Sequence, residues 1–220
     1  MTTYPAPYIE PWLRGTYAGV PAVGRAVLHA LDLALDDLAK WTEGLTDAEV
    51  DSMPLGLTPI AFHLRHIARA TDRILTYAEG GQLSAEQLAT LAAEQKQSGT
   101  LAELLAEVEA SFSNAAERIR VLATGNFDTP RTVGRKQLPT SMGGALVHVA
   151  DHTQRHVGQV VTTAKVLRAL REQSPTDVQL QKGWSGASRA RGLAFLRPPA
   201  QAEPGQVTQL DSPSDGVGGD

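Results

Sequence analysis

Apolar side chains recur at steps of three and four residues along four long segments of the chain. This spacing places them on one face of an α-helix, so each segment is predicted to be an amphipathic helix. The four predicted helices cover about 21–42, 59–77, 100–124 and 141–173. No stretch alternates convincingly between apolar and polar residues, which is the pattern of a half-buried β-strand. The sequence therefore predicts an all-α fold, most simply a four-helix bundle.

Two capping boxes mark shorter helical segments between the long helices. In Thr46 with Glu49, and in Ser84 with Gln87, the two side chains can bond to each other's backbone N–H groups at the start of a helix. The segment that begins at Ser84 is interrupted by Ser-Gly-Thr at 98–100. It is therefore predicted to be a weak helix within a longer connection.

The two ends of the chain differ in composition from its middle. Residues 1–20 are rich in Pro, Tyr and Gly and are expected to form an irregular N-terminal arm before the bundle at 21–173. Residues 174–220 are expected to form an extended tail, whose polar, Pro- and Gly-rich end is predicted to be disordered. Trp184 and Phe195 are candidates for anchoring this tail on the bundle.

Composition limits the functional classes. The chain has 220 residues, enough for one domain with arms, and 42% of them are hydrophobic, enough for a core. The formal net charge of -4 gives no reason to expect a nucleic-acid partner. The absence of cysteine excludes disulfides, cysteine-ligated zinc and a cysteine nucleophile in this chain. Because we find neither a signal peptide nor an apolar stretch of about 18 residues, we expect a cytoplasmic protein without a membrane partner.

Three of the six histidines fall within nine positions, in the segment HVADHTQRHVGQ. Residues four apart on an α-helix differ by about 40° in direction and about 6 Å in height, so His148, His152 and His156 follow one face. His152 and His156 replace apolar residues on the stripe that faces the core, whereas His148 falls at its margin. Two imidazoles one turn apart can bind one metal ion, but a buried polar seam or a solvated helix face would give the same spacing.

A third metal ligand would have to come from another helix. The segment AFHLRHIA offers His63 and His66, which lie on either side of the apolar stripe of the second predicted helix, and periodicity does not choose between them. His29 lies beside the stripe of the first predicted helix and suits a hydrogen-bond network. No histidine has Glu three positions before it and no HExxH occurs, which argues against ferritin-like di-iron sites and common zinc-protease sites.

Two motifs in order make the sequence similar to the DinB-like (DinB/YfiT) superfamily of metal-binding four-helix bundle proteins. LRHIA in the second predicted helix resembles the family element xxHLA, and DHTQRHVGQ in the fourth resembles HxxxHRGQ. The histidine of the first motif, His66, and the first histidine of the second, His152, are 86 residues apart. The resemblance covers about 15–172. It implies His66, His152 and His156 as metal ligands. It also implies an up-down-down-up topology with a crossover between helices 2 and 3, for which residues 80–99 are long enough.

The resemblance also implies a chemistry. Three neutral histidines leave coordination positions for water or substrate, and imidazole suits Zn, Ni, Fe or Mn. Family members include transferases that use low-molecular-weight thiols such as bacillithiol or mycothiol, and a maleylpyruvate isomerase. By resemblance, the protein would be a metal-dependent thiol S-transferase or hydrolase acting on a small molecule. A thiol cosubstrate would then supply the nucleophile that a chain without cysteine lacks.

The alternative function is a non-catalytic metal-binding or stress-response protein, whose metal only joins the second and fourth helices. Bundles of this type often pair through their helix faces, so the resemblance also implies a homodimer. No residue is assigned as catalytic from the sequence.

Further residues are predicted to support the site. Gln159, His148 and His63 are candidates for hydrogen bonding to the metal ligands. A connection of about 17 residues precedes the fourth predicted helix, which is long for a bundle. Its Arg131 and Arg135 would bind the carboxylates of an anionic thiol if this connection borders the site.

Overall fold

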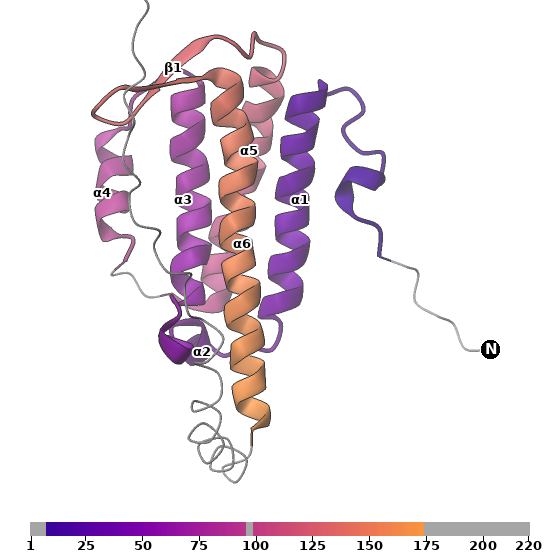
Figure 1. Ribbon diagram of the computed structural model, residues 1–220, viewed down its shortest axis with the longest axis vertical. Helices are drawn as coiled ribbons and strands as arrows, with labels where there is room; N and C mark the ends of the chain where they lie inside the picture. The colour runs from indigo at the N-terminus through magenta and orange to yellow at the C-terminus, as the bar shows by residue number, and fades with distance from the viewer. Residues whose placement is uncertain (1–7, 96–98, 174–220) are drawn as a thin grey trace, which may run out of the picture. The chain divides into compact units, whose positions relative to one another are not determined.

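The computed structural model describes residues 8–95 and 99–173, and within them the protein is mostly helical (Figure 1). The four longest helices lie side by side, close to the predicted ranges: α1 (Ala22–Thr42), α3 (Ile60–Ala78), α5 (Leu101–Leu122) and α6 (Met142–Glu172). Helix α6 packs against α1 and α3, and α5 packs against α3 and α1. The prediction of a mainly α-helical fold is confirmed.

Short elements connect the long helices. They are η1 (Pro11–Leu13), α2 (Asp47–Val50), η2 (Pro54–Gly56), α4 (Ala85–Ala93), β1 (Pro130–Val133) and β2 (Leu138–Ser141). Helix α2 and η2 lie between α1 and α3, α4 lies between α3 and α5, and the two strands lie between α5 and α6.

The core lies between the four long helices and consists mainly of aliphatic side chains. Leu28 of α1, Leu64 and Ile67 of α3, Val108 of α5 and Val149 of α6 are at most 1% exposed. Burying one such side chain contributes roughly 1.5–3 kcal/mol relative to leaving it in water. This shared core therefore holds α3 and α6 in contact, which matters because both carry histidines.

Three helices begin with a complete capping box, which satisfies N–H groups that the first turn leaves without partners. Thr46 and Ser84 cap α2 and α4 as predicted. Thr100 forms a third box with Glu103 at the start of α5. The Ser-Gly-Thr interruption is thus also the beginning of the next long helix.

Helix α4 returns the chain from the end of α3 to the opposite end of the helices, where α5 begins (Figure 1). There the Leu101 N–H donates to Asp47 of α2 at 2.8 Å. Near the start of α4, the Gln87 amide donates to Asp72 at 2.6 Å and to Thr76 at 2.9 Å, both on α3. No residue within α4 is buried, so polar contacts near its ends hold it in place.

The connection between α5 and α6 contains a β-hairpin that the sequence pattern did not predict. Strands β1 and β2 pair antiparallel, with Val133 opposite Leu138 beside the turn. Each strand has four residues, and all of them are exposed or half-buried. Without a buried face, nothing requires apolar and polar residues to alternate, so the pattern carries no strand signal. This small sheet corrects the expectation of a purely α-helical chain.

The described part of the N-terminal arm lies against α1. The Arg14 guanidinium forms an ion pair with Asp36 at 2.5 Å. The His29 Nε2 lies 3.0 Å from Thr16 Oγ1, so His29 takes part in the kind of hydrogen-bond network considered for it. His29 therefore ties the arm to α1.

The predicted tail at 174–220, with Trp184 and Phe195, lies outside the described residues. In the part of the chain that the structure describes, none of the helices combines the length and the apolar character needed to cross a membrane.

Candidate metal centre

The neighbouring helices α3 and α6 bring His66, His152 and His156 together. One nitrogen of each ring lies within 4.8 Å of the others. The His66 Nε2 is 3.2 Å from the His152 Nε2. The centroid of the His156 ring lies 4.5 Å from that of His66 and 4.6 Å from that of His152. The structure thus assembles the three residues that the resemblance implied as ligands.

His152 and His156 lie one turn apart on α6, at the edge of the core. Both are half-buried, whereas the residues that follow them, Thr153 and Val157, are at most 2% exposed. The sequence pattern placed the two histidines themselves on the core-facing stripe of this helix. Because steps of three and of four residues both fit 3.6 residues per turn, the pattern could not separate the histidines from the residues that follow them. The helix turns the following residues inward instead. The two imidazoles therefore lie between the apolar interior and solvent, where packing holds them and a ligand can reach them.

His66 is held by a carboxylate from the end of α4. Its Nδ1 lies 3.0 Å from Glu94 Oε2. Glu94 is 3% exposed, and its Oε1 also accepts from both terminal nitrogens of Arg73, each at 3.3 Å. Because a carboxylate accepts and does not donate, His66 carries a proton on Nδ1 and leaves the Nε2 lone pair directed toward His152. In metal sites, carboxylates orient metal-binding imidazoles in this way.

His156 has a neighbouring imidazole in His63. Their Nδ1 atoms lie 3.0 Å apart, and a hydrogen bond between them requires one to donate and the other to accept. If His156 binds an ion through Nε2, its Nδ1 carries the proton and donates to His63. This contact supports the predicted role of His63 as a hydrogen-bond partner of a ligand.

The imidazoles of His63, His152 and His156 favour their neutral forms. Burial first, and then the neighbouring histidines, lower the pKa values of His63, His152 and His156 from 6.5 to about 4. Burial alone would raise the pKa of Glu94, but the hydrogen bond with His66 and the charge of Arg73 outweigh it and lower the pKa overall. Neutral imidazole is the form that binds a metal ion, so protons compete little with a metal ion for His152 and His156 at neutral pH.

The donor set fits a divalent metal ion. Two nitrogens bound at 2.0–2.1 Å in tetrahedral geometry are about 3.3 Å apart. The Nε2 atoms of His66 and His152 are 3.2 Å apart. The other ring nitrogen of His152, Nδ1, is buried without a hydrogen-bond partner among the described residues, so Nε2 is the atom that positions this ring. Three neutral donors leave coordination positions for other ligands, as catalytic zinc sites do.

A pocket of about 350 Å³ opens beside His66 and His152. Its walls come from α3, α4, α6 and the hairpin and are largely apolar. They include Ile74, Tyr77, Leu83, Leu91, Val133 and Ala145. A small molecule in this pocket would therefore touch two of the three clustered histidines and otherwise meet mainly apolar surface.

Two other predicted neighbours of the ligands lie on α6. His148 borders the pocket, with its ring centroid 5.5 Å from that of His152 and its Nδ1 3.2 Å from Asp151. Gln159 is exposed, and its side chain makes no hydrogen bond with any described residue. The structure thus brings His148 to the site but directs Gln159 to solvent.

The two arginines predicted to bind substrate do not line the pocket. The Arg131 Nε donates to the carbonyl of Ala78 at 2.7 Å, so this side chain fastens the hairpin to the end of α3. Arg135 is exposed at the hairpin turn. The guanidinium that does line the pocket belongs to Arg73, and Glu94 neutralises it.

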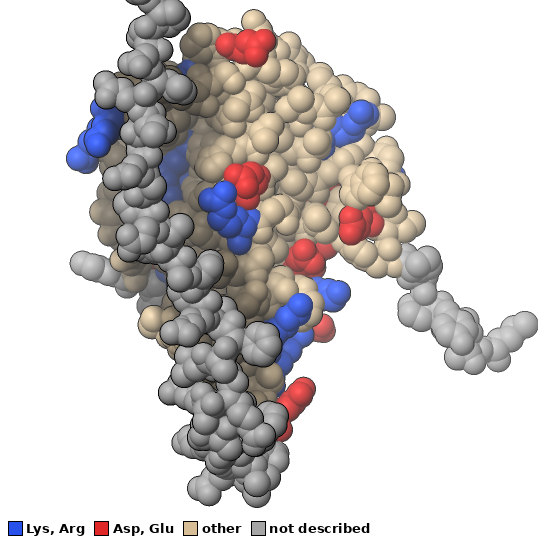
Figure 2. Space-filling view, in the orientation of Figure 1, with Lys and Arg blue, Asp and Glu red and all other residues tan. Residues whose placement is uncertain are grey.

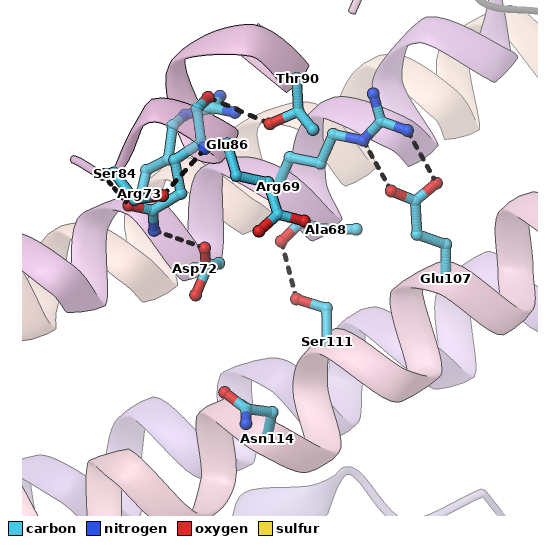
Figure 3. A pocket seen from close by; sticks show the side chains of 11 residues that line it. Ala68, Arg69, Asp72, Arg73, Ser84, Glu86, Thr90, Glu107, Ser111 and Asn114 are labelled. Atoms are coloured by element: carbon cyan, nitrogen blue, oxygen red, sulfur yellow. Dashed lines mark hydrogen bonds and ion pairs between the residues drawn. The ribbon is translucent and has the colours of Figure 1, made fainter.

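A larger pocket of about 640 Å³ lies between α3, α4 and α5 (Figure 3). Several of its polar side chains are engaged within the protein: Arg69 Nε lies 2.6 Å from Glu107 Oε1, and the Ser111 hydroxyl donates to the backbone carbonyl of Ala68 at 2.7 Å. None of the clustered histidines lines it, although Arg73 lines both pockets. The candidate chemistry therefore belongs to the smaller pocket.

Charged side chains are scattered over the face shown in Figure 2, with Lys and Arg close to Asp and Glu. Opposite charges also pair along α6, where Arg155 Nη2 lies 3.2 Å from Asp151 Oδ2. Proteins that bind nucleic acid usually present a continuous basic patch. The described residues visible on this face form no such patch.

One family of known proteins matches most of the helical part of the chain. Residues 30–160, more than half of the chain, match the family model of the DinB superfamily. The chain belongs to the DinB superfamily. A search of the curated proteins finds no match. Because the matched segment contains all three clustered histidines, DinB membership and the geometry together fit a metal-binding protein.

In this DinB-superfamily protein, Arg73 and Glu94 are the site residues that sequence reasoning missed. Arg73 follows His66 by seven residues, or two helical turns, which places both on one face of α3. That spacing is a weak signal that could have drawn attention to Arg73. Glu94 lies in the crossover, at no spacing that relates it to the histidine motifs, so only the three-dimensional structure reveals it.

Proposed function

We propose that the protein is a metal-dependent enzyme that acts on a small molecule at His66, His152 and His156. The observation that carries this proposal is the 3.2 Å approach of two imidazole Nε2 atoms from different helices, at the wall of a pocket of about 350 Å³. Structural zinc sites are usually closed by four protein ligands, whereas catalytic sites keep a position open. The proposed reaction is transfer of a low-molecular-weight thiol to a small electrophile, or hydrolysis of a small substrate.

The three histidines would hold Zn, Ni, Fe or Mn, since imidazole suits each of these metals. When bound, such an ion supplies Lewis acidity, which lowers the pKa of a thiol or water and polarises a carbonyl. Glu94 keeps the proton of His66 on Nδ1, so Nε2 is available as a donor. The largely apolar wall that includes Leu91 and Val133 favours a substrate with an apolar body. Because the chain has no cysteine, the thiol would come from a cosubstrate.

The finer features of the fold belong to the same proposal. We propose that α1, α3, α5 and α6 form a DinB-like four-helix bundle of up-down-down-up topology, with α4 in the crossover. The path of the chain in Figure 1 supports this topology, because α4 lies between the end of α3 and the start of α5. The homodimer and the cytoplasmic location stay predictions from the sequence.

Elemental analysis of protein purified without an imidazole column tests the proposal. We expect about one divalent metal per chain, with a water ligand whose exchange is detectable by relaxation of solvent protons in the Mn²⁺-loaded protein. A screen of thiols against small electrophiles would then identify the reaction. If metal binds without exchangeable water and no thiol is consumed, the non-catalytic alternative, in which the metal joins α3 and α6, replaces the enzyme.

A further inference from the structure

Helix α4 contacts the rest of the protein through few residues. None of its own residues is buried, and Leu88 and Leu91 are 41% and 42% exposed. A helix docked through an apolar face buries side chains of this kind. The deepest residue of this segment is the charged Glu94, directly after α4, which is 3% exposed. Docking of the crossover therefore depends on a buried carboxylate.

Glu94 makes three separate links to α3. Its carbonyl accepts from Arg65 Nη1 at 3.0 Å, its Oε1 accepts from Arg73 at 3.3 Å, and its Oε2 lies 3.0 Å from His66 Nδ1. Arg65 and Arg73 are 3% and 7% exposed, so these bonds lie in a medium of low dielectric constant. Hydrogen bonds to a charged group are stronger there than at the surface. Two of the links hold α4, and the third reaches the histidine cluster.

Arg73 makes the burial of this carboxylate possible. An ionised carboxylate taken out of water alone is strongly unfavourable, and a paired guanidinium offsets that cost. Arg73 lines both the pocket beside the histidines and the polar pocket of Figure 3, so its side chain lies between the two and is held there by Glu94. A change in this pair would affect the end of α4 and His66 together.

We propose that Glu94 is a positioning residue that couples docking of α4 to metal binding at His66; this inference rests on the proposed metal site. Glu94 fixes His66 with Nε2 unprotonated, which prepares that atom for an ion. A cation on Nε2 in turn makes Nδ1–H a stronger donor to Glu94. Coupling of this kind is reciprocal. The factor by which docking of Glu94 raises the metal affinity equals the factor by which bound metal raises the equilibrium constant for docking of α4. Because Leu91 of α4 lines the pocket, metal binding would also stabilise one wall of the substrate site.

The substitution Glu94→Gln tests the coupling, because it keeps the shape and one acceptor oxygen but removes the charge. We expect metal affinity, measured by competition with a chromophoric chelator, to fall about 10–100-fold. The absorption spectrum of the Co²⁺-loaded variant should also change. Glu86→Gln is the matched control, because Glu86 is an exposed acid in the first turn of the same helix, and it should leave both readouts unchanged.

Hydrogen exchange in the full-length wild type gives an independent measurement. Saturating metal should slow exchange of the amides of α4 by about the same 10–100-fold factor, and this slowing should be lost in Glu94→Gln. A merely structural role would lower the melting temperature equally with and without metal and leave the affinity of the folded protein unchanged.

Two results would overturn the proposal. One is a metal affinity of Glu94→Gln within about twofold of that of the wild type. The other is hydrogen exchange of the α4 amides in the wild type that is the same with and without metal. If Glu94→Gln does not fold, the wild-type exchange experiment still decides. A wild-type protein that binds no metal would instead refute the proposed function itself.

Discussion

His66 Nε2 on α3 lies 3.2 Å from His152 Nε2 on α6, and only one of these two nitrogens can carry a proton between them. Glu94 accepts the Nδ1 proton of His66, so when His66 is neutral the donor between the two Nε2 atoms is His152. His152 then has an unprotonated Nδ1, which is buried without a partner among the described residues. A metal ion bound by both Nε2 atoms requires the opposite tautomer of His152, with its proton on Nδ1.

Removing one member of this pair should abolish tight metal binding. His66→Ala and His152→Ala each delete one of three donors, and we expect metal affinity to fall by roughly 100-fold or more, beyond the loss typical of residues that only support a ligand. The measurement is metal content after dialysis against a weak chelator. His148→Ala serves as the control, because His148 is 48% exposed at its side chain and lies outside the three-histidine group. Unchanged metal content in both His66→Ala and His152→Ala would exclude this site.

Metal binding should switch the tautomer of His152. In ¹⁵N-labelled protein, the two ring nitrogens of a neutral histidine are distinguished by their chemical shifts and by couplings to the ring protons. We expect a protonated Nε2 in the metal-free protein and a protonated Nδ1 after addition of Zn²⁺. His66 should keep its proton on Nδ1 in both forms, because Glu94 accepts it throughout. The same His152 tautomer in both states would contradict the shared-proton arrangement.

The metal-free protein should lose stability between pH 6.5 and pH 4. The pKa values of His63, His152 and His156 are about 4 in the folded protein and 6.5 ordinarily. Between these two pH values the unfolded chain therefore binds more protons than the folded chain does. Each such proton changes the free energy of unfolding by about 1.4 kcal/mol per pH unit at full effect, and stability falls as the pH falls. His152 and His156 are half-buried, so solvent screening reduces this contribution.

Urea unfolding of the metal-free protein at pH 7 and pH 5 measures this effect. We expect a loss of roughly 1–3 kcal/mol at the lower pH. His156→Gln should reduce the difference in stability between the two pH values, because one of the three imidazoles with a lowered pKa is removed. Equal stability of the wild type at both pH values would show that these imidazoles are not held neutral by the fold.

Two glycines should respond in opposite directions to the same substitution. A Cβ on Gly24 of α1 would lie 2.4 Å from the Cβ of Ala123, just beyond α5, whereas one on Gly158 of α6 would meet nothing within 4 Å. Gly24→Ala should destabilise the protein by about 1–3 kcal/mol, because neither helix can yield easily at a packed crossing. Gly158→Ala should stabilise it by up to about 1 kcal/mol, because alanine favours an exposed helix. Urea unfolding at pH 7.5 gives both values, and a neutral Gly24→Ala would mean that α1 and α5 are less closely packed.

The long helices were predictable because their stripes fill one shared core. Leu64, Ile67 and Val149 show the pattern directly, since each apolar residue recurs where the next helical turn meets the core. The hairpin was not predictable, because no residue of β1 or β2 is buried and no periodic pattern results. Local packing therefore determined which elements could be recognised.

The site divides in the same way. His152 and His156 belong to one helix, so their spacing alone places them together, while the choice of His66 came from the family resemblance. Glu94 could not be predicted, because its contact with His66 depends on how the crossover docks, and α4 has no apolar face that fixes its position. Arg131 was predicted to bind a substrate carboxylate, but β1 places it beside the end of α3, where it donates to the backbone carbonyl of Ala78.

Filling the small pocket should block ligand access without disturbing the metal. Val133 of β1 lines this pocket, and its partner across the hairpin, Leu138, is 59% exposed and does not. Val133→Trp should occupy much of the volume of about 350 Å³, whereas Leu138→Trp adds the same side chain to the same hairpin facing solvent.

The Co²⁺-loaded proteins can be titrated with a small aromatic thiol and followed through the thiolate-to-cobalt absorption band. We expect Val133→Trp to weaken thiol binding about tenfold or more with unchanged cobalt content, because displaced apolar contacts and steric exclusion act together. Leu138→Trp should bind like the wild type. Equal thiol affinity in all three proteins would mean that ligands reach the histidines by another route than this pocket.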